Sequence, residues 1–444
     1  MVSKKNIRSI SVNALCTACG ACCGVCPSKA IIMKTNTSGY LLADVDEDKC
    51  INCGICYNVC PSTDRNPPQK EDIDIFHGKS ICGYIGYATD KEIRQKSQSG
   101  GIVTALLCYL LERKLVDGAV INTFEESTQR SRSVFAETKE KIIEGCGSYY
   151  TQSSVVDTIL KSCKGKKSAA VTLGCQAESL RLINENYPNV ELPEYVIGLV
   201  CAGQNSSHMI SDLVKQSGCR SNETVIKFRF RDKNIGGWPG NVSIHTDKSI
   251  YYMDKKKRHA VKPVYEAYRC IMCFDQMNIY SDIVVGDPWG FTLGDSEYGY
   301  SVVIARTEKG KKLLEEAMHD GIINMEMISV DKIIKGQTVD DRHKTKFFTS
   351  LGICKKNGWQ FPYNELCFED IEYQKADERS LMDLAERMEY TRKVYFENSK
   401  DNLEKMVQAK KMKIKRKEII SYPGNFLKRC IGYIMRKTHL KRSR

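Results

Sequence analysis

Long apolar runs are missing from this sequence of 444 residues. No segment approaches the roughly 20 consecutive apolar residues that a helix needs to cross a bilayer. The opening residues, MVSKKNIRSISVNALC, hold no apolar stretch of signal-peptide length. We therefore expect a cytoplasmic protein whose cysteines stay reduced. Histidine is also scarce, with seven residues, and none has a partner at ligand spacing in the sequence, so histidine-based metal or hydride chemistry is not expected.

Acidic residues are nearly absent from residues 410–444, which hold thirteen Lys or Arg and one acid, Glu418. This segment carries +12 of the formal net charge of +13, so the rest of the chain is nearly neutral. A neutral body gives no support for a nucleic-acid partner, and only the tail would be attracted to phosphate. Apolar residues recur between its basic clusters at helical intervals. Peripheral contact with an anionic membrane, at its inner face, is one interpretation and a solvated basic tail is the other.

Cysteine, in contrast, is abundant, with 21 residues, and the run C-x2-C-x2-C-x3-C-P occurs twice, 34 residues apart. It is the run of bacterial ferredoxins, in which the fourth Cys of each run ligates the other cluster. Zinc ribbons use widely separated cysteine pairs, so zinc is the less favoured alternative. The predicted ligands are Cys16, Cys19, Cys22 and Cys60 for one 4Fe-4S cluster, and Cys26, Cys50, Cys53 and Cys56 for the other.

Glycines and short strands complete this N-terminal module. Gly20 and Gly54 stand inside the two runs, where a tight loop must wrap around a cluster. Residues 30–34 and 40–45 have the β-branched or alternating pattern of the strands that cover such a module. Cys23, beside a predicted ligand, is given no role.

The longer remainder alternates strand-like and helix-like segments, which favours α/β layering. Strands are expected at residues 116–121, 169–173, 196–200 and 282–285, and helices at residues 206–216 and 309–318. The last three strands end in LGCQ, CAGQN and GDPWG. Because ligands gather beyond the carboxyl ends of strands in α/β sheets, these ends are expected to line one pocket.

A Ser-Gly-Gly sequence, residues 99–101, precedes an almost wholly apolar helix. Free backbone N–H groups at such a helix start suit a nucleotide-like cofactor. Simple helix capping is the alternative explanation.

Several segments resemble the coenzyme F-420 hydrogenase/dehydrogenase beta subunit family, in the form with a fused N-terminal two-cluster 4Fe-4S ferredoxin domain. The resemblance covers roughly residues 1–345. The matching segments are SGGIVTALL (99–107), SYYTQS (148–153), GCQ (174–176), IGLVCAGQNS (197–206), FRFRDKNIGGW (228–238) and CIMCFDQMNIYSDIVVGDPWG (270–290). Leu173-Gly174 replaces a usual Thr-Pro and Tyr149 replaces a common Lys, which leaves the usual substrate open.

The resemblance implies an oxidoreductase, a flavoprotein with FAD and a third 4Fe-4S cluster, exchanging hydride between the flavin and coenzyme F-420 or another organic substrate. It assigns no catalytic residue. Carried over by position, the residues at the flavin would be Ser99, Gly100, Gly101 and Thr104, with Asn205, Lys233, Asp287 and Trp289 as further candidates. The ligands of the third cluster would be Cys175, Cys270 and Cys273, with Cys201 or Cys146 as candidates for the fourth.

We therefore predict α+β and α/β architecture in five parts. These are a two-cluster 4Fe-4S ferredoxin domain (1–65), a linker (66–80), a larger α/β flavin and iron–sulfur domain (81–345), a helical extension (346–408) and a basic tail (409–444). The expected partners are a redox protein or ferredoxin and a small organic substrate or deazaflavin. Two alternatives stay open. One is an electron-transfer subunit of a larger redox complex, and the other is a reductase of a biosynthetic intermediate, such as a polysaccharide or lipid-linked precursor, in a host without coenzyme F-420.

Overall fold

The N-terminal module consists of short helices around one two-stranded sheet in the computed structural model, which describes residues 6–63, 74–293 and 297–421. Its elements are α1 (Arg8–Ser11), α2 (Ala21–Gly24), β1 (Ile31–Thr35), β2 (Leu41–Val45) and α3 (Ile55–Asn58). β1 pairs antiparallel with β2, which confirms the two expected strands. Gly20 and Gly54 precede α2 and α3 with φ of 83° and 76°. This left-handed conformation suits glycine and lets both cysteine runs turn tightly.

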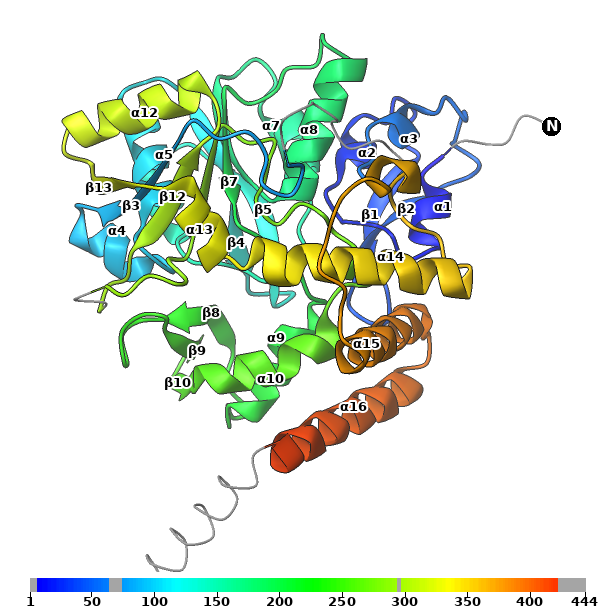
Figure 1. Cartoon of the computed structure of the whole chain (residues 1–444). Coiled ribbons are helices and arrows are strands. Elements are labelled where there is room, and N and C mark those ends of the chain that lie inside the picture. Colours follow the sequence, from blue (N-terminus) through cyan, green and yellow to red (C-terminus); the bar gives the residue numbers. More distant parts are fainter. Residues whose placement is uncertain (1–5, 64–73, 294–296, 422–444) are drawn as a thin grey trace, which may run out of the picture.

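An eight-stranded mixed sheet forms the centre of the larger body (Figure 1). Its strands, in the order β13-β3-β12-β11-β7-β6-β4-β5, are β3 (Cys82–Ala88), β4 (Gly118–Glu125), β5 (Arg130–Ala136), β6 (Ser168–Thr172), β7 (Tyr195–Leu199), β11 (Ile283–Gly286), β12 (Ser301–Ala305) and β13 (Ile323–Ile328). The strands β4, β6, β7 and β11 run parallel, whereas the pairings toward both edges are antiparallel. The expected strands are confirmed with shifted ends. Because β6, β7 and β11 are parallel neighbours, their polar carboxyl ends meet at one edge.

Helices cover both faces of this sheet. They are α4 (Lys91–Lys96), α5 (Ile102–Glu112), α6 (Lys139–Glu144), α7 (Val155–Ser162), α8 (Gly174–Asn186) and α12 (Glu308–His319). Successive strand residues point to opposite faces, so Ala119 packs in the core with α5 and α12 while Val120 packs with α7 and α8. α5 is buried along almost its whole length, as its apolar sequence requires.

A second, three-stranded antiparallel sheet lies below the large one in Figure 1. It is formed by β8 (Val225–Asp232), β9 (Asn241–Thr246) and β10 (Ile250–Met253), with α9 (His208–Gln216) and α10 (Lys255–Tyr265) packed against it. Its own core includes Phe228, Phe230 and Ile244 of the strands and Ile210 of α9. The next helix, α11 (Tyr268–Ile271), packs in a different core.

The chain ends in a helical region. Its elements are α13 (Val330–Gly336), η1 (Val339–Lys344), α14 (Thr345–Asn357), η2 (Glu365–Phe368), α15 (Glu378–Phe396) and α16 (Lys400–Ser421). α15 and α16 occupy most of residues 369–420, which contain no Gly or Pro. Residues 422–444 of the predicted basic tail, and residues 66–73 of the predicted linker, lie outside the described residues. Among the described residues, no helix has both the length and the apolar character to cross a membrane.

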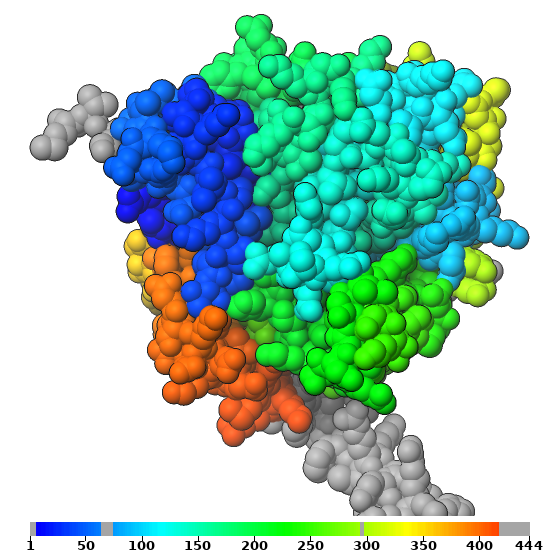
Figure 2. Space-filling view, turned by 180° about the vertical axis from the view of Figure 1, so that it is seen from behind, coloured from blue at the N-terminus to red at the C-terminus, as the bar shows by residue number. Residues whose placement is uncertain are grey.

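The N-terminal module shares a hydrophobic core with the body. Tyr40 and Tyr268 belong to the same buried cluster as Phe347 of α14. The amide of Val156 donates to Cys19 O at 2.9 Å, so the first cysteine run is hydrogen-bonded to α7. Figure 2 shows the surfaces of this module, the body and the C-terminal helices meeting directly. The module is therefore a fixed part of the fold rather than a tethered one.

Acid should loosen α16 from α15. Although partial burial raises the pKa of Glu386, hydrogen bonds from Lys410 and Lys413 outweigh it and lower this pKa to about 2. Since the folded pKa is depressed, the pair stabilises the docked helix above the ordinary carboxyl pKa of 4.5, and that contribution is lost as pH falls through 2. We expect amide hydrogen exchange in α16 to accelerate over this window.

The same experiment has a matched control. Glu386→Gln should show faster α16 exchange already at neutral pH, whereas Glu389→Gln, which removes an exposed ion pair within α15, should not. Equal exchange in both variants at neutral pH would refute the role of Glu386.

Candidate metal centres and cofactor site

The first cysteine group comprises Cys16, Cys19, Cys22 and Cys60. Cys22 and Cys60 each lie within electrostatic reach of Cys16 and Cys19, and Cys22 also lies within reach of Cys60. Burial, followed by the repulsion of neighbouring thiolates, raises the pKa of both Cys22 and Cys60. Thiolates this close together would need a cationic partner to stay ionised, and the irons of a 4Fe-4S cluster would supply one.

The second cysteine group comprises Cys26, Cys50, Cys53 and Cys56, which line one small cavity. The remaining three are the electrostatic neighbours of Cys56, and burial raises the pKa of Cys56. Cys53 is exposed, so this group is the more open to solvent. The adjacent Cys23 instead donates to Ile31 O at 2.8 Å. Both groupings agree with the crossed ligand sets, and iron ligation itself stays a prediction.

The third cysteine group lies in the body and comprises Cys175, Cys201, Cys270 and Cys273. Cys175 is in the first turn of α8, Cys201 follows β7 and Cys270 is in α11. The strongest charge neighbours of Cys175 are Cys273, Cys19, Cys201 and Cys270, in that order. Burial, then the charge of Cys270, raises the pKa of Cys201 to about 12. The donor set therefore fits a third 4Fe-4S cluster.

Cys146, the other candidate for the fourth ligand, lies elsewhere. Its thiol donates to Thr104 Oγ1 at 3.4 Å and accepts from Ser97 Oγ at 3.6 Å. Cys201 rather than Cys146 thus stands with the other three.

A single side chain connects the first and third groups. The hydroxyl of Ser179 in α8 lies 3.3 Å from Cys19 Sγ and donates to Cys175 O at 3.0 Å. Ser179 is fully buried. The first group therefore adjoins the third, while the second lies on the solvent side of the module.

The predicted flavin residues Ser99, Gly100 and Gly101 precede α5, as expected. A Cβ at Gly100 would come within 2.6 Å of Gly86 O and 2.7 Å of Ser301 N. The backbone amide of Gly100 donates to Ser301 Oγ. The missing side chain at Gly100 thus allows close packing against β3 and β12. Gly101 has φ of 85°, which suits the helix start. A flavin contact for these residues stays a prediction.

Lys233 ties this helix start to neighbouring loops. Its ammonium group, nearly inaccessible to solvent, donates to the carbonyl oxygens of Arg94, Ser99 and Tyr298. Burial, followed by the charges of Arg94 and Arg231, lowers the pKa of Lys233 to about 7. This concentration of positive charge favours an anionic ligand nearby.

Arg231 and Asp287 form a buried, two-pronged ion pair. The Nη1–Oδ2 distance is 2.5 Å and the Nη2–Oδ1 distance is 3.1 Å. The rings of Trp238 and the half-exposed Trp289 pack together at 5.1 Å, with the guanidinium of Arg231 about 6 Å from each. Trp289 and Asp287 thus meet Arg231 at the end of β11, beside the strand β8 that carries Arg231.

Three buried polar atoms near Arg231 have no hydrogen-bond partner: Gln98 Oε1, Asn205 Oδ1 and Trp238 Nε1. Gln98 Nε2 donates to Tyr150 OH at 2.8 Å, and Asn205 Nδ2 donates to Tyr150 O at 2.9 Å. Buried polar groups are nearly always paired, so these three atoms are available to a ligand or to water. Together with the cationic and aromatic side chains, they fit the phosphates and ring of FAD. Thr104 accepts a hydrogen bond from Cys146, whose charge also affects the pKa of Lys233.

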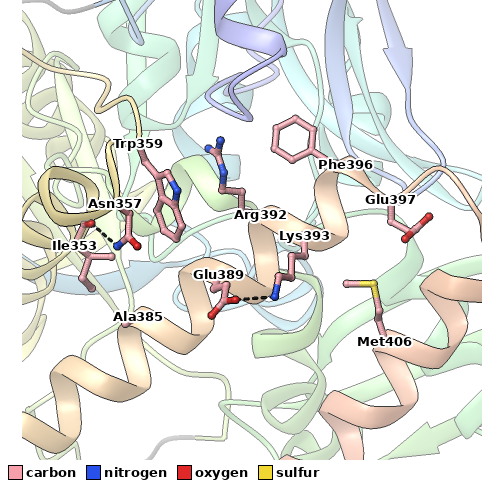
Figure 3. Close-up of a pocket in the computed structure, with 10 residues that line it drawn as sticks. All are labelled: Ile353, Asn357, Trp359, Ala385, Glu389, Arg392, Lys393, Phe396, Glu397 and Met406. Atoms are coloured by element: carbon pink, nitrogen blue, oxygen red, sulfur yellow. Dashed lines mark hydrogen bonds and ion pairs between the residues drawn. The ribbon is translucent and has the colours of Figure 1, made fainter.

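Two further features lie away from these residues. A hollow of about 700 Å³ between α14, α15 and α16 is lined by Trp359, Arg392 and Phe396 among others, and by none of the predicted site residues (Figure 3). His77 lies near two carboxylates, Asp74 three residues before it and Asp340 263 residues after it, with its Nε2 3.0 Å from Asp340 Oδ1. Sequence spacing did not reveal this neighbour. Lys344 pairs with the other carboxylate, Asp74, so we interpret this cluster as an ion-pair network.

Three family models match the chain. A 4Fe-4S dicluster domain matches residues 15–63, and the coenzyme F-420 hydrogenase/dehydrogenase beta subunit matches residues 84–161 with its N-terminal model and 165–331 with its C-terminal model. With the cysteine groups, these matches define an iron–sulfur oxidoreductase. The chain belongs to the coenzyme F-420 hydrogenase/dehydrogenase beta subunit family, in a form with a fused ferredoxin domain.

The relatives include hydrogenase and sulfite reductase chains. The coenzyme F-420 hydrogenase subunit beta of Methanothermobacter thermautotrophicus is 25% identical over 286 residues, which span 62% of this chain and 95% of the relative. The coenzyme F-420-dependent sulfite reductase of Methanocaldococcus jannaschii is 26% identical over 339 residues, 72% of this chain and 49% of the relative. A chain of the F-420-reducing [NiFe] hydrogenase complex from Methanosarcina barkeri has a TM-score of 0.49 and 24% identity, covering 64% of this chain and 95% of that chain.

Proposed function

We propose that the chain is an iron–sulfur flavoprotein that carries three 4Fe-4S clusters and one FAD, and that exchanges electrons between a redox partner and an organic substrate. The observation that carries this proposal is the convergence of twelve cysteines into three groups of four, of which the first and third are joined through Ser179. A dicluster ferredoxin alone needs eight of these cysteines. The four in the body extend the path inward.

The residues near Arg231 would hold the flavin. FAD accepts or delivers a hydride and exchanges electrons singly with iron–sulfur clusters, which handle one at a time. Lys233, Arg94 and Arg231 supply positive charge for its phosphates. Trp238 and Trp289 supply aromatic surface, and Gln98 and Asn205 supply unpaired acceptors for its N–H and O–H groups.

The substrate is coenzyme F-420 or another organic acceptor. The names of the relatives support a deazaflavin, since they include a hydrogenase, a formate dehydrogenase and a sulfite reductase described as acting with coenzyme F-420. Tyr149 stands where the family commonly has Lys, and burial raises the pKa of Tyr149 to about 12. An uncharged phenol there favours a substrate with less negative charge at that position.

Metal and flavin analysis tests the proposal directly. After anaerobic purification and reconstitution we expect about twelve irons and about twelve sulfides per chain, four for each cluster, with one FAD released on denaturation. If the analysis gave only about eight irons and eight sulfides per chain and no flavin, only the ferredoxin module would remain and the proposal would be overturned.

Some relatives are named as subunits, which favours a second candidate, an electron relay within a larger complex. To separate the two, protein reduced by dithionite is mixed with oxidised coenzyme F-420 and the deazaflavin absorbance is followed. Turnover by the isolated chain supports the enzyme. Reoxidation only by another small metabolite favours a reductase of a biosynthetic intermediate, and no reoxidation by either favours the relay.

A further inference from the structure

Arg269 lies between the first and third cysteine groups. It directly precedes Cys270 of the third group in the sequence. Its guanidinium donates to Ser62 Oγ at 2.7 Å and to Pro61 O at 3.1 Å, in the two residues that follow Cys60 of the first group. Only 2% of Arg269 is exposed, so its charge is held in place away from water.

Among the described residues, no carboxylate is hydrogen-bonded to Arg269. Its remaining hydrogen bond goes to Tyr363 OH at 2.5 Å, and the ring of Tyr363 lies 4.8 Å from the guanidinium carbon. All three acceptors are therefore neutral oxygens. The groups within electrostatic reach that can be negative include Cys60, Cys270, Cys273 and Glu178. A buried guanidinium needs counter-charge, and three of these four groups are predicted cluster ligands.

The second cysteine group has a different environment. The electrostatic neighbours of Cys56 are the other cysteines of its own group, Cys53, Cys26 and Cys50. Cys53 is exposed, so solvent can balance charge there. Arg269 thus lies beside the first and third cysteine groups but is not among the neighbours of Cys56 in the second.

We propose that Arg269 is a shared counter-cation that raises the reduction potentials of the clusters at the first and third cysteine groups. The proposal rests on the three-cluster function proposed above. One-electron reduction adds one negative charge to a cluster, and a fixed cation beside its cysteines stabilises the added charge. Because one side chain adjoins both groups, the two potentials are moved together and the electron can pass between them without a large step.

The test is a redox titration of the reconstituted full chain, followed by the electron paramagnetic resonance signal of each cluster. Arg269→Gln removes the charge but keeps a polar group. We expect it to lower the equilibrium constant for reduction of the clusters at the first and third groups by about tenfold, which is 59 mV for one electron. The cluster at the second group should shift by much less.

Arg258→Gln is the matched control. Arg258 is also a buried arginine that donates to a backbone carbonyl, Phe230 O, and its charged neighbours are Tyr150, Arg231 and Asp287 rather than cysteines. We expect it to leave all three cluster potentials unchanged. Unchanged potentials in Arg269→Gln, an equal shift at all three clusters, or the same shift in Arg258→Gln would each overturn the proposal.

Iron content separates this inference from the proposed function. A wild-type chain with eight irons means that the three-cluster function has failed, whereas twelve irons with unmoved potentials means that only the role of Arg269 has failed. If Arg269→Gln and Arg269→Met both lose irons while Arg269→Lys keeps twelve, the need for a cation at this position supports the proposal. Loss of irons in Arg269→Lys as well would show that shape rather than charge is required, and would overturn it.

Discussion

Replacing Cys175 by alanine should remove one complete cluster, lowering the iron content from about twelve to about eight per chain. Cys175 is mostly buried and has cysteines of both the first and third groups as charge neighbours. Cys146 is not expected to replace this ligand, because it is hydrogen-bonded with Ser97 and Thr104 and is not among the charge neighbours of Cys175. Electrons delivered to the ferredoxin clusters should then no longer reach the flavin. Stopped-flow bleaching of the flavin after mixing with dithionite-reduced ferredoxin measures that loss.

The matched control is Cys163→Ala. Cys163 is also buried, in the core between the sheet and α7, and no cysteine is among the groups that affect its pKa. This variant should keep about twelve irons and normal flavin bleaching. If Cys175→Ala retained the wild-type iron content, or if flavin bleaching persisted with eight irons, the proposed path through the third group would be wrong.

Replacing Arg231 by methionine should cost about 3–5 kcal/mol of unfolding free energy, because it leaves the carboxylate of Asp287 buried without its partner. Only 2% of the Arg231 side chain and 15% of the Asp287 side chain are exposed. The same change removes positive charge from the proposed phosphate site. We therefore expect FAD to be lost during gel filtration. Urea unfolding followed by circular dichroism measures the stability, and flavin fluorescence after denaturation measures retention.

A double variant separates the two effects. Arg231→Met/Asp287→Leu replaces the whole pair by apolar groups, which should restore much of the stability but not the flavin. In the control, Lys309→Met breaks the partly exposed ion pair with Asp282 and should cost about 1 kcal/mol or less, with FAD retained. FAD that stays bound in both Arg231 variants would place the flavin elsewhere.

The local motifs could be interpreted from sequence because their geometry is contained in a few consecutive residues. The spacing of Cys16, Cys19 and Cys22 fixes a loop, and Gly20 shows the positive φ which that loop needs. The strand ends near residues 173 and 201 could also be placed from sequence, because apolar runs stop there. In the fold, β6 and β7 are parallel neighbours, so these two ends lie at the same edge of the sheet. The sequence left Cys201 and Cys146 as alternatives for the fourth ligand, because only the order of strands in the sheet brings Cys201 beside Cys175.

Contacts that depend on chain folding could not be foreseen. Arg269 meets the residues after Cys60 from more than 200 positions away. His77 and Asp340 are 263 positions apart. The packing of Gly100 against Gly86 and Ser301 likewise depends on how α5 approaches β3 and β12. From the sequence alone, this glycine therefore suggested a ligand contact instead. In each case the sequence shows the residue type but not its neighbour.

The shared core of the N-terminal module and the body has a kinetic consequence. Many electron carriers swing on a linker, and their transfer rates then depend on how often the two centres meet. Here Cys19 O is held by the amide of Val156, and Tyr40 is packed with Tyr268 and Phe347. No search step separates the first and third groups, so internal transfer should be insensitive to solvent viscosity. Glycerol should slow only the encounter with an external partner.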